Sequence, residues 1–307
     1  MDIELADMKT RKGPDGVHLF DRKSGLNILL DEVDVPSTEW SVAPRQVSVA
    51  LLNACDLKCN YCYAPKQKAR LSRQVVERWL VELSEGGCLG IGFGGGEPTL
   101  HPDFAAICQF AERHTNMAVT FTTHGHRLNP RLLDQLSGSV HFIRVSMDGV
   151  GSTYEALRGK PFESLITNIH RARAISAIGL NVVVNDFTVT QLDEISNVAA
   201  ELGVSELLLL PQQSTATVAA ASDEIGNKVR HWIQHYTGTV RLAISENGIE
   251  TALMCNPLPK EKGLRSYAHV NADGVLKTSS YATRGQLIGQ SGIITALQDL
   301  NNMEDQA

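Results

Sequence analysis

The sequence predicts an α/β protein whose main part is an open six-stranded (β/α)6 barrel. From Gln46 onward, short apolar runs alternate with amphipathic stretches, as parallel strands alternate with crossover helices. These runs carry Val, Ile and Leu at consecutive positions, as expected where both faces of a sheet are covered. Six such units are too few to close an eight-stranded barrel. We therefore expect a partial TIM barrel with an N-terminal β-hairpin and a small α+β C-terminal extension.

The first 45 residues form the predicted N-terminal extension. Residues 1–16 are polar, and we expect them to be loosely held. Val17–Phe20 and Leu26–Leu30 flank a loop that ends in Gly25, a pattern typical of a β-hairpin. Pro36 to Pro44 is expected to be a linker.

Residues 46–236 form the predicted barrel. Its expected strands are Val47–Leu52, Leu89–Phe93, Ala118–Thr122, Phe142–Ser146, Leu180–Val184 and Glu206–Leu210. Its expected helices are Ser72–Glu85, Phe104–His114, Arg131–Leu136, Phe162–Ile178, Leu192–Leu202 and Ala219–Tyr236. Ser72 is the expected N-cap of its helix. Residues 237–307 form the predicted C-terminal extension, with short strands at Val240–Ile244 and Tyr267–Val270.

Charge and hydropathy exclude several classes of partner. Lys and Arg total 28 against 34 for Asp and Glu, a formal charge of −6, which argues against general binding to nucleic acid. The chain has neither an apolar run of 18 residues nor a signal-peptide pattern. We expect a protein without a membrane partner, and a cytoplasmic one, because free thiols need a reducing compartment.

Three cysteines, Cys55, Cys59 and Cys62, are separated by three and by two residues. Three thiolates on one short loop can hold three irons of a [4Fe–4S] cube and leave the fourth iron open to a small molecule. Clusters that only carry electrons are closed by four cysteines. Zinc with a distant fourth ligand remains an alternative, although the nearest histidines are His18 and His101. Chance clustering of buried cysteines is another, whereas six cysteines in 307 residues are too sparse for a disulfide framework.

Polar or glycine-rich motifs follow the next three predicted strands. They are Gly94–Pro98, Thr122–Gly125 and Ser146–Gly149. Active sites of parallel barrels gather at the carboxyl ends of the strands. The cysteine loop and these motifs are therefore expected on one rim.

The cysteine motif after the first strand, with Gly95-Gly96-Glu97-Pro98 after the second, resembles the radical S-adenosylmethionine (SAM) superfamily. The resemblance covers residues 46–215. It implies one [4Fe–4S] cluster held by three cysteines, and SAM bound to the open iron. In that family an electron from the cluster cleaves SAM, and the 5′-deoxyadenosyl radical removes a hydrogen atom from carbon.

The resemblance also implies SAM contacts, at Tyr61, Gly95, Gly96, Glu97, Thr122, Thr123 and Ser146. Tyr61 would lie near the adenine. The two glycines would let the backbone approach the methionyl amino group, since a Cβ there would collide with it. Glu97 would form hydrogen bonds near that end, and the hydroxyls would reach the ribose or the methionyl carboxylate.

Candidate substrate contacts are His124, Arg158, Asn185, Gln212 and Gln213. For His124 a solvated loop position is the alternative, and for Arg158 a surface ion pair. Asp186 is a candidate base, and Cys255 a candidate hydrogen-atom donor that would return hydrogen to a substrate radical. The alternative for Cys255 is a small buried hydrophobe, the role we also expect for Cys88 and Cys108.

The C-terminal extension resembles the SPASM/twitch type in outline, from His269 to a closing helix. That type holds auxiliary clusters with further cysteines. A cysteine is expected near Thr278-Ser279-Ser280 and none is present. We therefore predict a degenerate extension without an auxiliary metal.

Together these features predict a radical SAM enzyme that abstracts hydrogen from carbon of a peptide or peptide-like natural-product precursor. The hairpin offers an edge for strand pairing with such a peptide. The alternatives are the same chemistry on a nucleoside, sugar or amino acid, and a non-catalytic iron–sulfur sensor or assembly protein. A flavodoxin- or ferredoxin-type electron donor is the expected protein partner.

Overall fold

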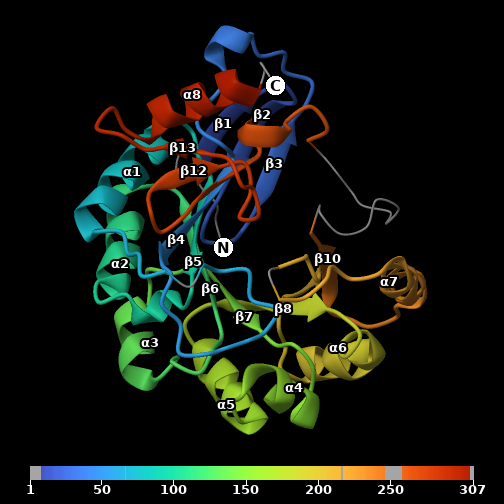
Figure 1. Ribbon diagram of the computed structural model, residues 1–307. Coiled ribbons are helices and arrows are strands. Elements are labelled where there is room, and N and C mark those ends of the chain that lie inside the picture. The colour runs from blue at the N-terminus through green and yellow to red at the C-terminus, as the bar shows by residue number, and fades with distance from the viewer. Residues whose placement is uncertain (1–7, 66, 216, 246–257, 305–307) are drawn as a thin grey trace.

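The chain forms two sheets, whose strands are labelled in Figure 1. The computed structural model describes residues 8–65, 67–215, 217–245 and 258–304. The smaller sheet is antiparallel and contains β1 (Lys9–Gly13), β2 (Gly16–Phe20) and β3 (Asn27–Leu30). The larger sheet has ten strands in the order β10-β9-β8-β7-β6-β5-β4-β11-β12-β13.

The six predicted strands lie in the centre of the large sheet, in sequence order and all parallel. They are β4 (Gln46–Leu52), β5 (Gly90–Gly95), β6 (Ala118–Thr123), β7 (Phe142–Ser146), β8 (Ala177–Val184) and β9 (Glu206–Pro211). Each is followed by a crossover, so their carboxyl ends meet at one rim, as the sequence predicts.

Residues from the predicted C-terminal extension lengthen this sheet at both edges. β10 (Arg241–Ile244) pairs with β9, and β11 (Tyr267–Val270) pairs with β4, both in parallel. β12 (Val275–Lys277) and β13 (Gln286–Leu287) continue the second edge in antiparallel pairs. The candidate hydrogen donor Cys255 lies outside the described residues.

Helices cover the outer side of the sheet, as Figure 1 shows. They are α1 (Arg73–Glu85), α2 (Phe104–His114), α3 (Pro130–Leu136), α4 (Gly151–Arg158), α5 (Phe162–Ala172), α6 (Leu192–Glu201), α7 (Asp223–His235) and α8 (Ile293–Glu304), with 3-10 turns η2 (Ser37–Glu39), η3 (Pro98–Leu100), η4 (Val189–Gln191) and η5 (Gly263–Arg265). Side-chain caps start three helices: Ser72 accepts from Val75 N, Asn129 from Leu132 N and Ser222 from Ile225 N. Not one of the described helices combines the length and apolar character that crossing a bilayer requires.

A single apolar core fills the space between helices and sheet. Residues at alternate positions of β4 and β5, such as Val47, Leu51 and Ile91, are fully buried against this layer. The rings of Phe104 on α2 and Phe121 on β6 meet edge to face at 5.1 Å. The intervening positions of β5 and β6 carry only Gly, Ala or Thr, whereas Phe142, Leu208 and Leu210 occupy such positions on β7 and β9.

Several elements differ from the sequence prediction. β1 falls in the segment that we expected to be loosely held; it is ordered by pairing with β2 and by burial of Lys9 and Arg11. α4 was not predicted. The predicted helix Phe162–Ile178 ends at Ala172, and β8 begins at Ala177, because Ile178 and Gly179 pair with Ile143 and Arg144 of β7.

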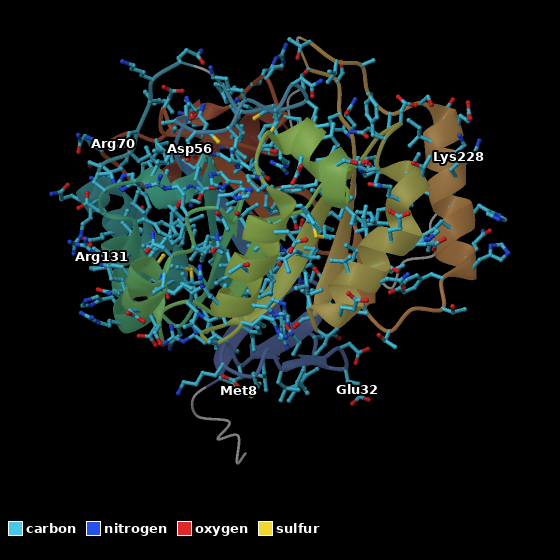
Figure 2. The ribbon with its side chains drawn as sticks, turned by 90° about the horizontal axis from the view of Figure 1, so that it is seen from below. Met8, Glu32, Asp56, Arg70, Arg131 and Lys228 are labelled. Carbon is cyan, nitrogen blue, oxygen red and sulfur yellow. The ribbon has the colours of Figure 1, made fainter. Side chains whose placement is uncertain are left out.

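Arg11 attaches the small sheet to the rest of the molecule. Its guanidinium donates to Glu261 Oε1 at 2.7 Å and to the carbonyls of Ala43, Gly87 and Arg265 at 2.8–3.0 Å. Both side chains of the ion pair are 3% exposed. Ala43 and Gly87 precede β4 and β5, so the small sheet lies at the amino ends of the barrel strands. Figure 2 shows it, with Met8 and Glu32, at the end of the molecule away from Asp56 of the cysteine loop.

Arg11→Ala is expected to lower the free energy of unfolding by about 3–5 kcal/mol, because it leaves the Glu261 carboxylate buried without a partner. Urea denaturation of the metal-free protein measures this change. The matched control is Lys12→Ala, whose partner Glu39 is 53% exposed and whose loss is expected to cost at most about 1 kcal/mol. Equal midpoints for the two variants would contradict this role for Arg11.

Candidate functional site

The cysteine loop follows β4 at the carboxyl rim. Cys55 is exposed, Cys59 and Cys62 are partly exposed, and all three are free thiols. Two of them accept hydrogen bonds: Leu57 N donates to Cys55 Sγ at 3.4 Å, and Arg158 Nη1 donates to Cys59 Sγ at 3.6 Å. Cys88 and Cys108 are fully buried in the core, as predicted.

The end of β5 lies against the chain that leads into this loop. Gly96 N donates to Leu52 O at 2.7 Å and Glu97 N to Ala54 O at 2.8 Å. A Cβ on Gly95, whose φ is +121°, would lie 2.2 Å from Leu52 O; one on Gly96 would lie 2.1 Å from Ala54 O. These glycines are therefore required by the packing of two protein segments, a reason separate from any contact with SAM.

The Glu97 carboxylate joins two motifs of the rim and is 1% exposed. Its Oε1 accepts from Thr123 Oγ1 at 2.8 Å and from the hydroxyl of Thr99 at 2.6 Å. Its Oε2 accepts from His124 N at 2.9 Å. Glu97 thus fixes the loop after β6, and the Thr123 hydroxyl donates its hydrogen bond to this carboxylate.

His124 is buried and contacts the cysteine loop. Its Nε2 lies 2.8 Å from Asp56 Oδ1 and 3.5 Å from Glu97 Oε2. Cys55, Asp56 and His124 offer ligand atoms that all lie within 4.8 Å of one another. A thiol, a carboxylate and an imidazole are ligand types that zinc also accepts.

Asp148, which follows β7, is completely buried and holds three elements together. Its Oδ2 accepts from Tyr61 Oη at 2.6 Å and forms an ion pair with Arg158 Nη2. Its Oδ1 accepts from Val183 N of β8 at 2.6 Å. Burial, and next the Asp148 carboxylate, raise the pKa of Tyr61, so its hydroxyl stays protonated and donates. Burial alone would lower the pKa of Arg158, but Asp148 together with Tyr61, Cys59 and Tyr154 outweighs it, so the pKa is raised.

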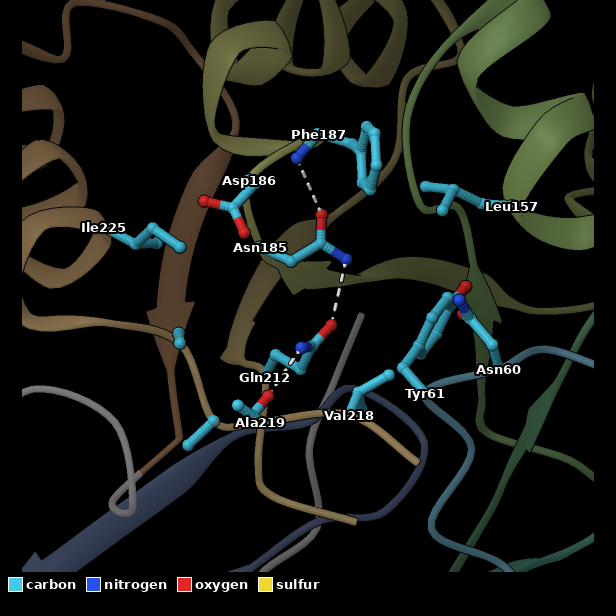
Figure 3. A pocket seen from close by; sticks show the side chains of 12 residues that line it. Asn60, Tyr61, Leu157, Asn185, Asp186, Phe187, Gln212, Val218, Ala219 and Ile225 are labelled. Carbon is cyan, nitrogen blue, oxygen red and sulfur yellow. Dashed lines mark hydrogen bonds between the residues drawn. The ribbon is translucent and has the colours of Figure 1, made fainter. Parts of the chain in front are cut away.

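A cavity of about 290 Å³ opens beside the cysteine loop, and Figure 3 shows its lining. Asn60 and Tyr61 form one wall. Asn185, Asp186, Phe187 and Gln212 form the other, at the ends of β8 and β9. The remaining lining residues are Leu157, Val218, Ala219, Ala220, Ala221 and Ile225. The segment after β9 reaches the cysteine loop, since Thr217 Oγ1 donates to Asn60 O at 2.7 Å.

The two amides of the cavity are partly used by the protein itself. Asn185 Oδ1 accepts from Phe187 N at 3.0 Å, and Asn185 Nδ2 donates to Gln212 Oε1 at 3.2 Å. Gln212 Nε2 donates to Ala219 O at 2.8 Å. Among the described residues each amide therefore has one N–H left for a ligand. The Asp186 carboxylate is exposed at the same wall.

The structure thus divides the predicted site residues. Asn185, Asp186, Gln212 and Tyr61 share the cavity. The cavity lining does not include His124, Arg158 or Gln213. His124 and Arg158 form hydrogen bonds with the cysteine loop, and Gln213 Nε2 donates to Pro211 O at 3.1 Å. Ser146 is the last residue of β7 and Thr122 the last but one of the neighbouring β6; both are partly exposed.

Sequence reasoning missed Asp148 and Asp56 as site residues. Each carried a signal: Asp148 lies in a motif that ends a strand at the rim, and Asp56 directly follows the first cysteine of the loop. Their partners Arg158 and His124 were found, but as substrate contacts.

The residues present fit an iron–sulfur cluster. Three free thiols share one loop near the surface, and two accept N–H donors, the kind of hydrogen bond that tunes such clusters. The buried Nε of Arg158, beside Cys59, has no partner among the described residues. A bound group that offers acceptors would satisfy it.

Comparison with known proteins agrees with this reading. The sequence profile of the Radical SAM superfamily matches residues 49–199. Mycofactocin maturase MftC of Mycobacterium tuberculosis (strain CDC 1551 / Oshkosh) is 28% identical over 171 residues, which cover 53% of this chain and 44% of MftC. PqqA peptide cyclase of Streptomyces rochei is 26% identical over 219 residues, 64% of this chain and 58% of the cyclase. The chain spans about half the length of these curated relatives.

The crystal structure of Streptococcus suis SuiB bound to precursor peptide SuiA has a similar fold. It superposes with a TM-score of 0.77 at 14% identity, over 95% of this chain and 87% of SuiB. At this identity the likeness concerns the fold alone, and it confirms the predicted α/β class with a mostly parallel sheet.

Gly96→Ala is expected to displace the cysteine loop, because its Cβ would overlap Ala54 O. We expect a loss of about 1–3 kcal/mol in stability and a severalfold fall in iron bound after reconstitution. Gly94→Ala is the matched control, since a Cβ there has nothing within 4 Å. Iron analysis and thermal unfolding measure both effects. Equal iron content in the two variants would refute the steric argument.

Proposed function

The chain belongs to the radical SAM superfamily, and we propose that it is an enzyme that modifies a peptide or peptide-like natural-product precursor. We propose that Cys55, Cys59 and Cys62 hold a single [4Fe–4S] cluster. When bound, this cluster supplies the electron that cleaves SAM and so starts hydrogen abstraction from carbon.

The residues of this chain would bind and orient the reactants. We propose that Tyr61, Thr122, Thr123, Ser146 and the Gly95–Glu97 segment surround SAM. Tyr61 belongs both to the cysteine loop and to the cavity wall. The substrate would then lie between this wall and the ends of β8 and β9, with Asn185 and Gln212 donating to it. Asp186 is the group at this wall that could accept a proton.

The chemistry of the cavity carries the proposal of a peptide. None of the described residues that line it is Lys, Arg or His. Such cations commonly pair with the phosphates of a phosphorylated metabolite. The lining instead combines apolar surface, from Phe187, Leu157 and the three alanines, with amides that suit a peptide backbone. This favours a neutral peptide segment over a nucleotide.

Two of the similar proteins support this proposal. One is named as a peptide cyclase, and the other is a structure bound to its precursor peptide. The N-terminal hairpin supports it less than its sequence indicated, because the small sheet lies at the end of the molecule away from Asp56 of the cysteine loop (Figure 2). We also propose a flavodoxin- or ferredoxin-type protein as the electron donor.

The finer points of the architecture stay proposals as well. We interpret β4–β9 with their helices as the partial barrel of residues 46–236, preceded by the extension 1–45. We interpret 237–307 as a degenerate SPASM/twitch-like extension without an auxiliary cluster. Its described part contributes β10 to β13 and α8.

Anaerobic reconstitution followed by incubation with SAM and dithionite tests the enzyme class. We expect about four irons per chain and formation of 5′-deoxyadenosine. Ala substitution of Cys55, Cys59 or Cys62 should abolish both, whereas Cys108→Ala should retain both, since Cys108 is buried on α2. A fully loaded cluster that yields no 5′-deoxyadenosine would favour a sensor instead.

Phe187→Ala tests the substrate cavity. The ring is 62% exposed at the cavity wall, and its burial by a peptide should contribute about 1 kcal/mol, so we expect KM to rise about fivefold with kcat little changed. Synthetic peptides encoded beside this gene, deuterated at carbon, are the probe, and deuterium in 5′-deoxyadenosine is the readout. Leu287→Ala, equally 62% exposed on β13, is the control. Transfer of deuterium to 5′-deoxyadenosine from GTP or a sugar, but from no peptide, would contradict the peptide proposal.

A further inference from the structure

We propose that Arg158 is a positioning residue that tunes the iron–sulfur cluster: it donates a hydrogen bond to the Cys59 thiolate and raises the reduction potential. This inference rests on the proposed cluster and adds to it a residue that controls its electron affinity. The sequence offered Arg158 as a substrate or SAM contact, with a surface ion pair as the alternative; the ion pair that it forms with Asp148 is buried.

The position of Arg158 is fixed by contacts on two sides. Nη1 lies 3.6 Å from Cys59 Sγ, while Nη2 pairs with the Asp148 carboxylate. The side chain is 11% exposed, and its Cζ lies 5.8 Å from the centre of the Tyr61 ring. Arg158 is the last residue of α4, and these contacts hold its guanidinium next to the Cys59 thiol.

Asp148 holds the guanidinium without cancelling its effect on the sulfur. Its carboxylate is fully buried and also accepts from Tyr61 and Val183, so it cannot turn away. Sulfur and carboxylate contact different terminal nitrogens of the same guanidinium. The pair thus forms a dipole whose positive end faces Cys59.

The three thiols are not equivalent in this respect. Cys55 accepts from a neutral backbone N–H, and Cys59 from a cation. For Cys62 no such donor is found within the described part of the chain. Arg158 Nε–H is also buried without an acceptor among the described atoms. A buried donor left unpaired is costly, and a cluster or its bound ligand would offer it an acceptor.

The sign of the effect follows from charge. Reduction adds one electron to the cluster, which dithionite supplies in the experiment, and no atom is transferred. A fixed positive charge beside a ligand stabilises the more negative, reduced state, and burial strengthens this interaction. Removing the cation should therefore make reduction harder.

Arg158→Gln in the reconstituted full chain, without SAM, tests the proposal. We expect a cluster that is reduced about tenfold less readily, equivalent to a potential about 59 mV more negative for one electron, in a titration followed by electron paramagnetic resonance. Arg127→Gln is the matched control: it removes the same charge beside the same loop, where Arg127 lies 3.6 Å from Asp56 but is 42% exposed. The reduction potential of Arg127→Gln should shift much less than that of Arg158→Gln.

Asp148→Asn separates tuning from a general structural role. It removes the counter-charge and leaves the cation beside Cys59, so the potential should move in the opposite direction, to more positive values. A merely structural role would not reverse the sign. If Arg158→Gln loads no cluster, the direction in which Asp148→Asn shifts the reduction potential decides between tuning and a structural role. Arg158→Lys keeps a cation at this position, so its reduction potential should stay close to that of the unmodified protein.

The proposal is overturned if the shift of Arg158→Gln equals that of Arg127→Gln, or if Asp148→Asn leaves the potential unchanged or lowers it. Failure of all three variants to load a cluster would also overturn it, since the residues would then be purely structural. The formation of 5′-deoxyadenosine and the transfer from a peptide are measured separately, so the proposed function can stand while this inference fails.

Discussion

The buried carboxylate of Asp148 is the interaction on which the arrangement of the site depends. It binds the cysteine loop through Tyr61, β8 through Val183 N and the end of α4 through Arg158. A carboxylate without solvent contact is tolerable because each oxygen has hydrogen-bonded partners and a cation neutralises it. The same contacts place an arginine beside Cys59, so the group that holds the loop also fixes the electrostatic environment of one thiol.

A second junction holds the other side of the loop. Gly95 and Gly96 let the end of β5 approach the Leu52–Ala54 carbonyls, and Glu97 then carries the connection on to Thr123 and His124. His124 returns to Asp56, next to Cys55. The first cysteine is thereby linked to β5 and β6, and the second to β7 and α4. The loop is exposed, yet its position is set by the rigid sheet beneath it.

The sequence by itself determined the class of fold and the location of the site. The six central strands fall within a few residues of their predicted places, because short apolar runs between amphipathic stretches mark parallel strands between crossover helices. The expected burial of both faces holds for β4 and β8, whereas β5, β6 and β7 alternate between buried and partly buried residues. The motifs share one rim since parallel strands end on the same side. The sequence prediction failed where tertiary contacts determine the local structure. β1 is polar but is ordered by pairing with β2 and by the contacts of Arg11. Ile178 was predicted to be helical but pairs with β7.

Only the tertiary structure decided the partners within the site. Tyr61 and Asp148 are 87 residues apart, and Cys59 and Arg158 are 99 apart, so no local period or spacing relates them. It also assigned the glycines a packing role, and it brought Asn185 and Gln212 into one cavity with Tyr61. A motif can specify which side chains carry chemistry, but their mutual contacts depend on how the crossovers bring distant strand ends together, which is a property of the packed sheet.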